Sequence, residues 1–347
     1  MDKFQSFTQL HERVDEWDSQ LHDHFEPANA LKLEGFRPEL VSGNIATNMP
    51  HGLLTEHAFR QLSDRLDVPA TWAWDNERCP APVRNYIYGH KFLMSKENTE
   101  YLVRMRGTSA PIVRAVLTKE YATYNHRDLV NAMADAVGNL GASAKVFRAD
   151  VGDELRGYVL LDNIDFGAIG GNEPKGTADG GGAGGLRPAI YFRNSEIGTS
   201  RVRITGGLYR DVCSNGMILG WQADEAMAIT HRRRSYAHVS VLVNEAIADG
   251  LKMSETAAKR FLDMRAIAIP TTSLSSIVDG WAQKYGLTIG VKDNWLSALS
   301  GLGEPTMFDV VNAATFQAQS QEGEERETLE RMAGDMVFAT RPELRAR

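Results

Sequence analysis

Two neighbouring runs of the chain, residues 187–193 and 201–209, carry apolar side chains at alternate positions. Successive side chains of a β-strand point to opposite faces of its sheet, so this period predicts strands with one apolar and one polar face. We expect the two runs to pair antiparallel, because only residues 194–200 join them. The polar face would carry Tyr191, Arg193, Arg201, Arg203 and Tyr209, and the apolar face Ile190, Phe192, Val202 and Ile204.

Further hairpins and helices surround this pair. The predicted hairpins join residues 101–106 to 112–118 and residues 144–149 to 158–162. Apolar residues that recur every three or four positions predict amphipathic helices. These helices comprise residues 4–24, 55–66 and 129–140, then 239–262, 273–285, 294–299, 307–317 and 322–336. Thr55 is the expected N-cap of the second helix, and the prolines of residues 79–83 predict a loop.

Together these elements predict an α+β fold, with a central antiparallel sheet of hairpins packed by helices and a largely helical C-terminal part. We expect a helical and extended arm at residues 1–50, an α+β core domain at 51–235 and a helical region at 236–347. The glycine-rich tract at residues 167–185 predicts a flexible surface excursion.

The charge is unevenly distributed along the chain. The formal net charge of -7 argues against a protein that coats duplex DNA by charge alone. Residues 1–30 hold seven acidic against two basic side chains, whereas residues 187–234 hold eight arginines against four acidic side chains. A central anion-binding surface would produce this asymmetry, and so would ordinary solvated faces.

The sequence also predicts a cellular compartment. Cys79 and Cys213 lie far apart and in no C-x-x-C pair, which argues against a disulfide framework or a zinc site. No apolar run approaches the length of a membrane span, and residues 1–30 lack the apolar core of a secretory signal. We therefore expect a cytoplasmic protein with no membrane partner, although a virion component would share these features.

The Arg/Tyr face of the two strands is the main functional signal. Guanidinium groups fork to phosphates, and aromatic rings stack on the bases of single-stranded nucleic acid. The alternative is that this face is the solvated side of an antiparallel sheet. Two further groups of arginines would extend the surface, namely Arg104, Arg106 and Arg114 of the first hairpin and Arg232, Arg233 and Arg234 after the strands. The second group has the alternative of being a solvated charge run.

The sequence offers no recognisable catalytic constellation and implies no cofactor. Residues 174–177, Pro-Lys-Gly-Thr, do not follow the residue order of a phosphate-binding P-loop. Asp162 and Asp165 could chelate a divalent cation, but residues of this type also cap loops. Cys213 could be a nucleophile, but the Asn215-Gly216 pair that follows it favours a tight turn with Cys213 buried.

Several segments together resemble a known family. They are Arg114-Ala-Val-Leu-Thr118 with Tyr121, Asn194-Ser-Glu-Ile-Gly198, Tyr209-Arg-Asp-Val-Cys-Ser-Asn-Gly-Met217, the basic run at His231 and Phe308-Asp-Val-Val-Asn-Ala313. Over roughly residues 50–317 the chain resembles the phage- and plasmid-like proteins that share domain of unknown function 932. The glycine tract at residues 167–185 departs from that pattern. The resemblance implies residence on a mobile element and supplies no chemistry.

The order of elements is similar to the core of ring-forming single-strand annealing proteins, in which a helix, antiparallel strands and a long helix follow one another. That likeness implies phosphate binding in a basic groove without a cofactor. We therefore expect a phage- or plasmid-encoded accessory of recombination or replication that binds single-stranded nucleic acid, with self-assembly into a homo-oligomer as one arrangement. The alternatives are a structural or interaction protein of a phage particle and a metal-dependent nuclease.

Overall fold

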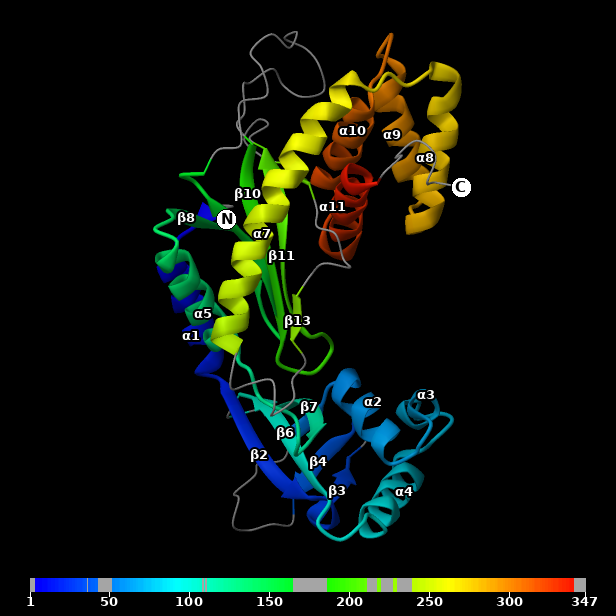
Figure 1. The fold of residues 1–347 in the computed structure, drawn as a ribbon. Helices are drawn as coiled ribbons and strands as arrows, with labels where there is room; N and C mark the ends of the chain where they lie inside the picture. Colours follow the sequence, from blue (N-terminus) through cyan, green and yellow to red (C-terminus); the bar gives the residue numbers. More distant parts are fainter. Residues whose placement is uncertain are drawn as a thin grey trace.

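The computed structural model of the chain describes residues 4–35, 37–42, 52–107, 109, 111–164, 186–210, 217–219, 227–229 and 239–339. The fold is α+β, as the sequence predicts. Two sheets follow one another along the long axis of the molecule, helices pack on their faces, and a helical C-terminal region lies beside the second sheet (Figure 1). In the described part of the chain, no helix is both long and apolar enough to cross a membrane.

The first sheet has six strands in the order β2-β6-β7-β5-β4-β3. Their bounds are β2 (Leu21–Pro27), β3 (Leu31–Glu34), β4 (Glu39–Ser42), β5 (Gly52–Leu54), β6 (Glu100–Arg106) and β7 (Ile112–Thr118). The pairs are antiparallel except β5 with β7, and the predicted hairpin of β6 and β7 is confirmed. Helices α2 (Glu56–Arg65), α3 (Ala70–Trp74) and α4 (Ala81–Leu93) contribute to its hydrophobic core.

The domain boundaries expected at residues 50 and 235 stay predictions.

The second sheet has seven strands in the order β1-β8-β9-β10-β11-β12, and β13 also pairs with β11. Their bounds are β1 (Phe4–Gln5), β8 (Ala144–Val151), β9 (Glu154–Leu161), β10 (Leu186–Ser195), β11 (Val202–Arg210), β12 (Met217–Leu219) and β13 (Met227–Ile229). The antiparallel pairing predicted for residues 187–193 and 201–209 is confirmed, as is the burial of Ile190, Phe192, Val202 and Ile204. Helices α1 (Phe7–Asp18), α5 (His126–Asn139) and α7 (Val239–Asp263) pack on this apolar face.

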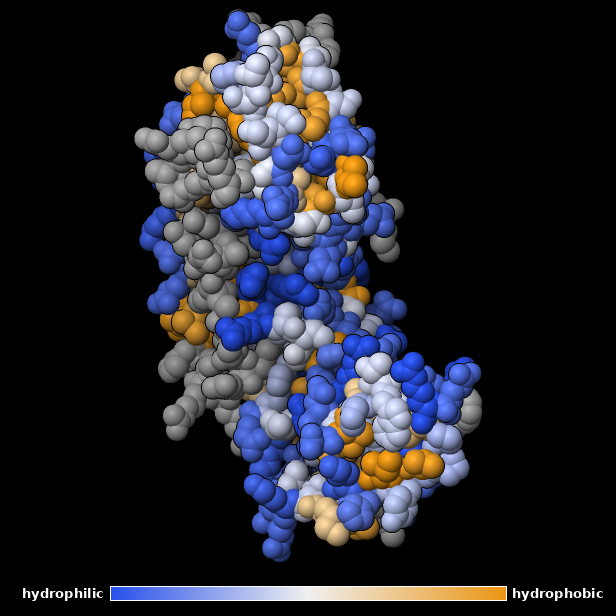
Figure 2. Space-filling view, turned by 90° about the vertical axis from the view of Figure 1, so that its right-hand side faces the viewer, coloured by the Kyte–Doolittle hydropathy of each residue, from blue (hydrophilic) through white to orange (hydrophobic). Residues whose placement is uncertain are grey.

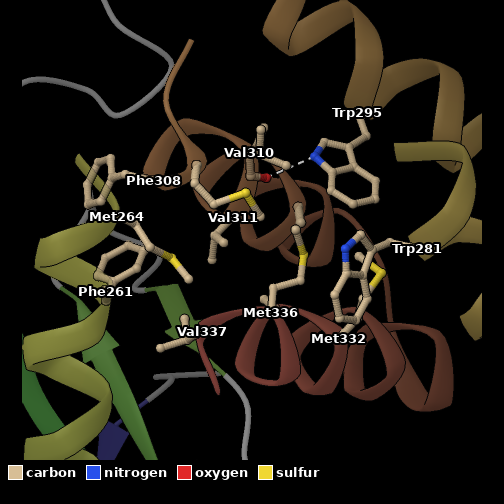
Figure 3. Packing of buried hydrophobic residues seen from close by; sticks show 14 of the residues in the cluster. Phe261, Met264, Trp281, Trp295, Phe308, Val310, Val311, Met332, Met336 and Val337 are labelled. Atoms are coloured by element: carbon tan, nitrogen blue, oxygen red, sulfur yellow. Dashed lines mark hydrogen bonds between the residues drawn. The ribbon is translucent and has the colours of Figure 1, made fainter. Parts of the chain in front are cut away.

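The helical C-terminal region has its own hydrophobic core. It comprises the end of α7 with α8 (Thr271–Tyr285), α9 (Ile289–Ser300), α10 (Met307–Gln319) and α11 (Gly323–Phe338). Figure 3 shows Trp281 and Trp295 packed with Met332 and Met336, all of them buried. The indole Nε1 of Trp295 donates to the carbonyl oxygen of Val310 at 3.0 Å, which satisfies the one polar atom of that ring.

The N-terminal helix is shorter than the sequence predicts. A helix was expected over residues 4–24, but α1 covers only Phe7–Asp18. Ser6 and Gln9 form a capping box that fixes its start. After its end, residues 21–27 gain a ladder of hydrogen bonds by pairing with β6 as strand β2. Tertiary pairing therefore overrides the helical period in this segment.

The proline-rich segment at residues 79–83 was predicted to be a loop, and this is wrong from Ala81 onward. Helix α4 begins at Ala81, with Pro82 in its first turn. Proline carries no penalty there, because the backbone N–H groups of the first helical turn have no hydrogen-bond acceptor within the helix. The cap predictions succeed elsewhere, since Thr55 caps α2 by accepting from the backbone N–H of Ala58.

Candidate functional site

A row of three arginines crosses the polar face of the second sheet. Arg193 of β10 lies directly opposite Arg156 of β9 on one side and Arg203 of β11 on the other. Neighbouring strands lie about 4.8 Å apart, so three positive charges are held close together by the backbone register. Like charges in opposed positions destabilise a sheet. An anion bound between the guanidinium groups would offset that repulsion.

The arginine row forms one wall of a pocket between the sheet and helix α11, with a volume of about 290 Å3. The pocket is lined by Glu154, Arg156, Tyr191, Arg193 and Arg203 from the strands and by Glu324, Glu327, Thr328 and Arg331 from α11. Four guanidinium groups face three carboxylates in this lining, which leaves a net charge of +1. A strongly hydrophilic band crosses the molecule below the helical region in the view of Figure 2.

The three arginines of the row differ in how far they are neutralised. Arg193 Nη2 donates to Glu154 Oε2 at 2.7 Å, whereas Arg156 donates from Nη1 to Glu327 Oε1 at 3.1 Å and from Nε to Asp150 Oδ2 at 3.4 Å. Arg203 makes no ion pair with any residue that the structure describes, and the buried Nε of Arg193 has no hydrogen-bond partner there. The side chains of Arg156 and Arg193 are 30% and 32% exposed. The row therefore offers unused positive charge that solvent and a ligand can reach.

Helix α11 covers the neighbouring part of the polar face with two carboxylates. The hydroxyl of Tyr191 donates to Glu327 Oε2 at 3.5 Å. Glu330 Oε1 accepts from Arg148 Nη1 at 3.1 Å, and its Oε2 accepts a hydrogen bond from the hydroxyl of Tyr158. Glu330 is only 2% exposed, and this burial raises its pKa to about 7. Acidic side chains of α11 thus occupy part of the basic strand face.

The polar strand face is less open than the sequence predicts. Tyr191 is 3% and Tyr209 is 1% exposed, so neither ring is available for stacking on a base. Tyr191 is covered because α11 packs over it, whereas Tyr209 packs edge-on against Phe147, with ring centroids 5.4 Å apart. The outward arginines are confirmed in part, since Arg193 and Arg203 are half-buried and Arg201 is exposed.

Arg104 and Arg114 were expected to extend the same surface, and this is wrong. Both are 1% exposed, because β6 and β7 are buried on both faces. They surround Glu196, which is fully buried just after β10. Glu196 Oε2 accepts from Arg114 Nη2 at 2.9 Å, its carbonyl oxygen accepts from Arg104 Nη1 at 2.7 Å, and its Oε1 accepts from the backbone N–H of His126 at 3.1 Å. We call these four residues the Glu196 cluster.

The Glu196 cluster joins the two sheets. Burial alone would raise the pKa of Glu196, but His126, Arg104 and Arg114 outweigh it and lower that pKa. Burial is also the main cause that lowers the pKa of His126. The cluster therefore holds a buried carboxylate against the Arg114 guanidinium, while Arg104 binds the backbone carbonyl of the same residue. Arg106, which was expected beside Arg104 on the surface, is half-buried, with its guanidinium carbon 4.9 Å from the ring centroid of Trp17.

Other predicted features are neutralised or lie outside the described residues. Asp162 forms ion pairs with Lys145 at 2.9 Å and with Arg187 at 2.7 Å, which uses up its charge. Within the described ranges, no group of three or more potential ligands could hold a metal ion. The predictions for Asp165, the tract at residues 167–185, Cys213, Arg232, Arg233 and Arg234 concern residues outside those ranges.

Sequence reasoning missed Arg156, Glu327 and Glu330. Arg156 could have been found, because it precedes Tyr158 by two positions and so shares a strand face with it. The predicted strand at residues 158–162 begins too late to include it. The two glutamates carry no local signal, since only the tertiary packing of α11 brings them to the sheet.

Comparison with known proteins places the chain in a family. No curated protein and no solved structure matches the chain significantly. The model of the family described as Domain of unknown function (DUF932) matches residues 114–300. This match begins at Arg114 and contains Glu196, so the Glu196 cluster lies within it apart from Arg104. It also contains the whole arginine row. The chain therefore belongs to the family defined by domain of unknown function 932.

Proposed function

We propose that the protein binds a nucleic-acid strand through its phosphates at the arginine row. The observation that carries the proposal is the register of Arg156, Arg193 and Arg203, which stand opposite one another on three adjacent strands. A sheet gains no stability from such a row by itself. A phosphodiester backbone, which presents anionic oxygens at regular intervals, is the common biological ligand that neutralises several arginines at once.

The shape of the site favours a single strand over a duplex. The arginines line a recessed pocket beneath α11, and Arg193 and Arg203 are half-buried in it. A flexible single strand can enter such a recess. A double helix is too stiff and too wide to bend into it. Arg201 is exposed and lies two residues before Arg203 in the sequence. It can therefore contact a further phosphate of the bound strand. A strand-binding accessory of recombination or replication would use a site of this kind.

The buried tyrosines change the expected mode of binding. Affinity would come from phosphate contacts, because the rings of Tyr191 and Tyr209 are covered. Binding of this kind depends little on base sequence and strongly on salt. For three phosphates neutralised on a single strand, the logarithm of the binding constant should fall with the logarithm of salt concentration with a slope of about -2.

A binding titration tests the proposal. Fluorescence anisotropy of a labelled oligothymidylate would be followed as protein is added at several salt concentrations, beside a duplex of the same length. We expect the single strand to bind more tightly than the duplex, with a negative salt slope. Absence of single-strand binding at low salt would refute the proposal, and equal binding of the two forms would refute its preference for single strands.

A further inference from the structure

Helix α11 has two chemically different sides. Its apolar side carries Leu329, Met332 and Met336, which are fully buried in the core of the helical region. Figure 3 shows the two methionines directed into that core. Its acidic side carries Glu327 and Glu330, and both reach the basic face of the second sheet. The carboxylates are therefore direct polar links between the helical region and the sheet.

Glu327 stands at the border of the arginine row. Its Oε1 accepts from Arg156 Nη1 at 3.1 Å, and its Oε2 accepts from the hydroxyl of Tyr191 at 3.5 Å. Glu327 also lines the pocket that contains Arg193 and Arg203. Glu327 thus accepts two hydrogen bonds on a basic face, as the anionic oxygens of a phosphate group would. Arg156 cannot give the same donor to both at once.

We propose that the first turns of α11 act as an internal competitor for the nucleic-acid strand, with Glu327 holding Arg156 until a phosphate displaces it. This inference rests on the proposed function and adds its regulation. The competitor belongs to the same chain, so its local concentration is fixed by the fold and does not depend on protein concentration. Only a ligand with several phosphates, which also contacts Arg193 and Arg203, gains enough to release Arg156.

Glu330 anchors the competing turn. It is 2% exposed and accepts from Arg148 and Tyr158, one turn beyond Glu327 on the same helix. Its contacts lie deeper under α11 than the solvent-accessible row, so they can persist while Glu327 moves. Displacement therefore requires a rearrangement of one side chain and the first turn, without separation of the helical core.

The test compares two substitutions that each remove one negative charge near the start of α11. Glu327→Gln removes the proposed competitor, and Glu322→Gln removes an exposed charge that does not line the pocket. In an oligothymidylate titration we expect Glu327→Gln to bind about tenfold more tightly than wild type and Glu322→Gln within about twofold. The salt slope of Glu327→Gln should stay near that of wild type, because the same three arginines contact phosphates in both complexes and only the cost of displacing Glu327 is removed.

A third variant checks that the effect passes through Arg156. In an Arg156→Gln background, the gain caused by Glu327→Gln should vanish. If Glu327→Gln and Glu322→Gln change the affinity equally, the competitor is refuted while strand binding stands. If the wild type and all variants fail to bind, the proposed function itself is refuted. Should Glu327→Gln fail to fold, wild-type amide exchange over residues 323–330 decides: it must quicken when oligothymidylate is added, and unchanged or slower exchange overturns the inference.

Discussion

Arg114 and Glu196 form a fully buried ion pair, Nη2 to Oε2 at 2.9 Å, that fastens β7 of the first sheet to the end of β10 in the second. Arg114 also donates from Nε to Asp153. Glu196 belongs to the Asn-Ser-Glu-Ile-Gly segment through which the chain resembles its family. That segment has a structural role here: it follows β10 of the second sheet, and its carboxylate and carbonyl groups receive donors from β6 and β7 of the first sheet and from the start of α5.

Removal of the Glu196 carboxylate should destabilise the protein strongly. Glu196→Ala removes the fully buried anionic partner of Arg114, which keeps only its ion pair with the partly exposed Asp153, and breaking a buried ion pair costs about 3–5 kcal/mol. The free energy of unfolding in urea measures this. As a control, Glu56→Ala breaks the exposed pair with Arg60 and should cost about 0.5 kcal/mol or less. Similar losses in the two variants would show that the Glu196 cluster does not hold the sheets together.

Two glycines should respond in opposite ways to substitution by alanine. Helix α7 crosses β11 so closely that a Cβ at Gly206 would lie 2.2 Å from the carbonyl oxygen of Gly250. Gly206→Ala therefore forces backbone apart and should cost about 3 kcal/mol or prevent folding. Gly89, inside α4, has no atom within 4 Å of such a Cβ. Gly89→Ala should raise the free energy of unfolding by about 0.5–1 kcal/mol, which a thermal unfolding curve would show as a higher melting temperature. A tolerated Gly206→Ala would contradict the close crossing.

Burial of Glu330 should make stability fall as pH rises. Its pKa is raised from 4.5 to about 7 in the folded protein. The folded state therefore keeps a proton that the unfolded chain releases above pH 4.5, and stability falls between those values by up to about 3 kcal/mol. The lowered pKa of His126 acts in the opposite direction, and Asp18, with its pKa raised to about 6, acts in the same one.

The comparison of wild type with Glu330→Gln isolates the contribution of Glu330, because His126 and Asp18 contribute equally to both proteins. We expect the stability advantage of wild type over the variant to shrink as pH rises from 5 to 8. Urea unfolding at several pH values gives this difference directly. A constant difference would mean that Glu330 is ionised throughout and that its burial is not as the structure describes.

Cys79 should be unreactive in the folded protein. It is fully buried, and burial raises the pKa of its thiol, so little thiolate forms near neutral pH. In a Cys213→Ser variant, a thiol reagent should label no cysteine until denaturant unfolds the chain. Rapid labelling under native conditions would contradict the burial of Cys79.

The strand pair at the centre of the fold was predictable because its signal is local. Alternation along residues 187–193 and 201–209 fixes which side chains share a face, and the structure has that pairing. The Thr55 cap of α2 was predictable for the same reason. Neither prediction depends on parts of the chain that are distant in sequence.

The environment of the polar face was not predictable, because it depends on packing between distant segments. Nothing near Tyr191 indicates that Glu327, from the last helix, will lie against it. The sequence predicts Arg104 and Arg114 at the surface, because arginine is seldom buried. Their burial depends on Glu196, which is 82 residues from Arg114 in sequence and meets it only when the two sheets associate.

The most direct test of the central claim is the salt dependence of oligothymidylate binding for Arg193→Ala with Arg203→Ala. The matched control is Lys252→Ala with Lys259→Ala, which removes two positive charges from exposed positions of α7. We predict that the arginine pair lowers affinity and flattens the salt slope by about 1.4, two phosphate contacts at about 0.7 each, while the lysine pair leaves the slope near that of wild type. Equal slopes in wild type and the arginine variant, with unchanged melting transitions, would contradict binding at the arginine row.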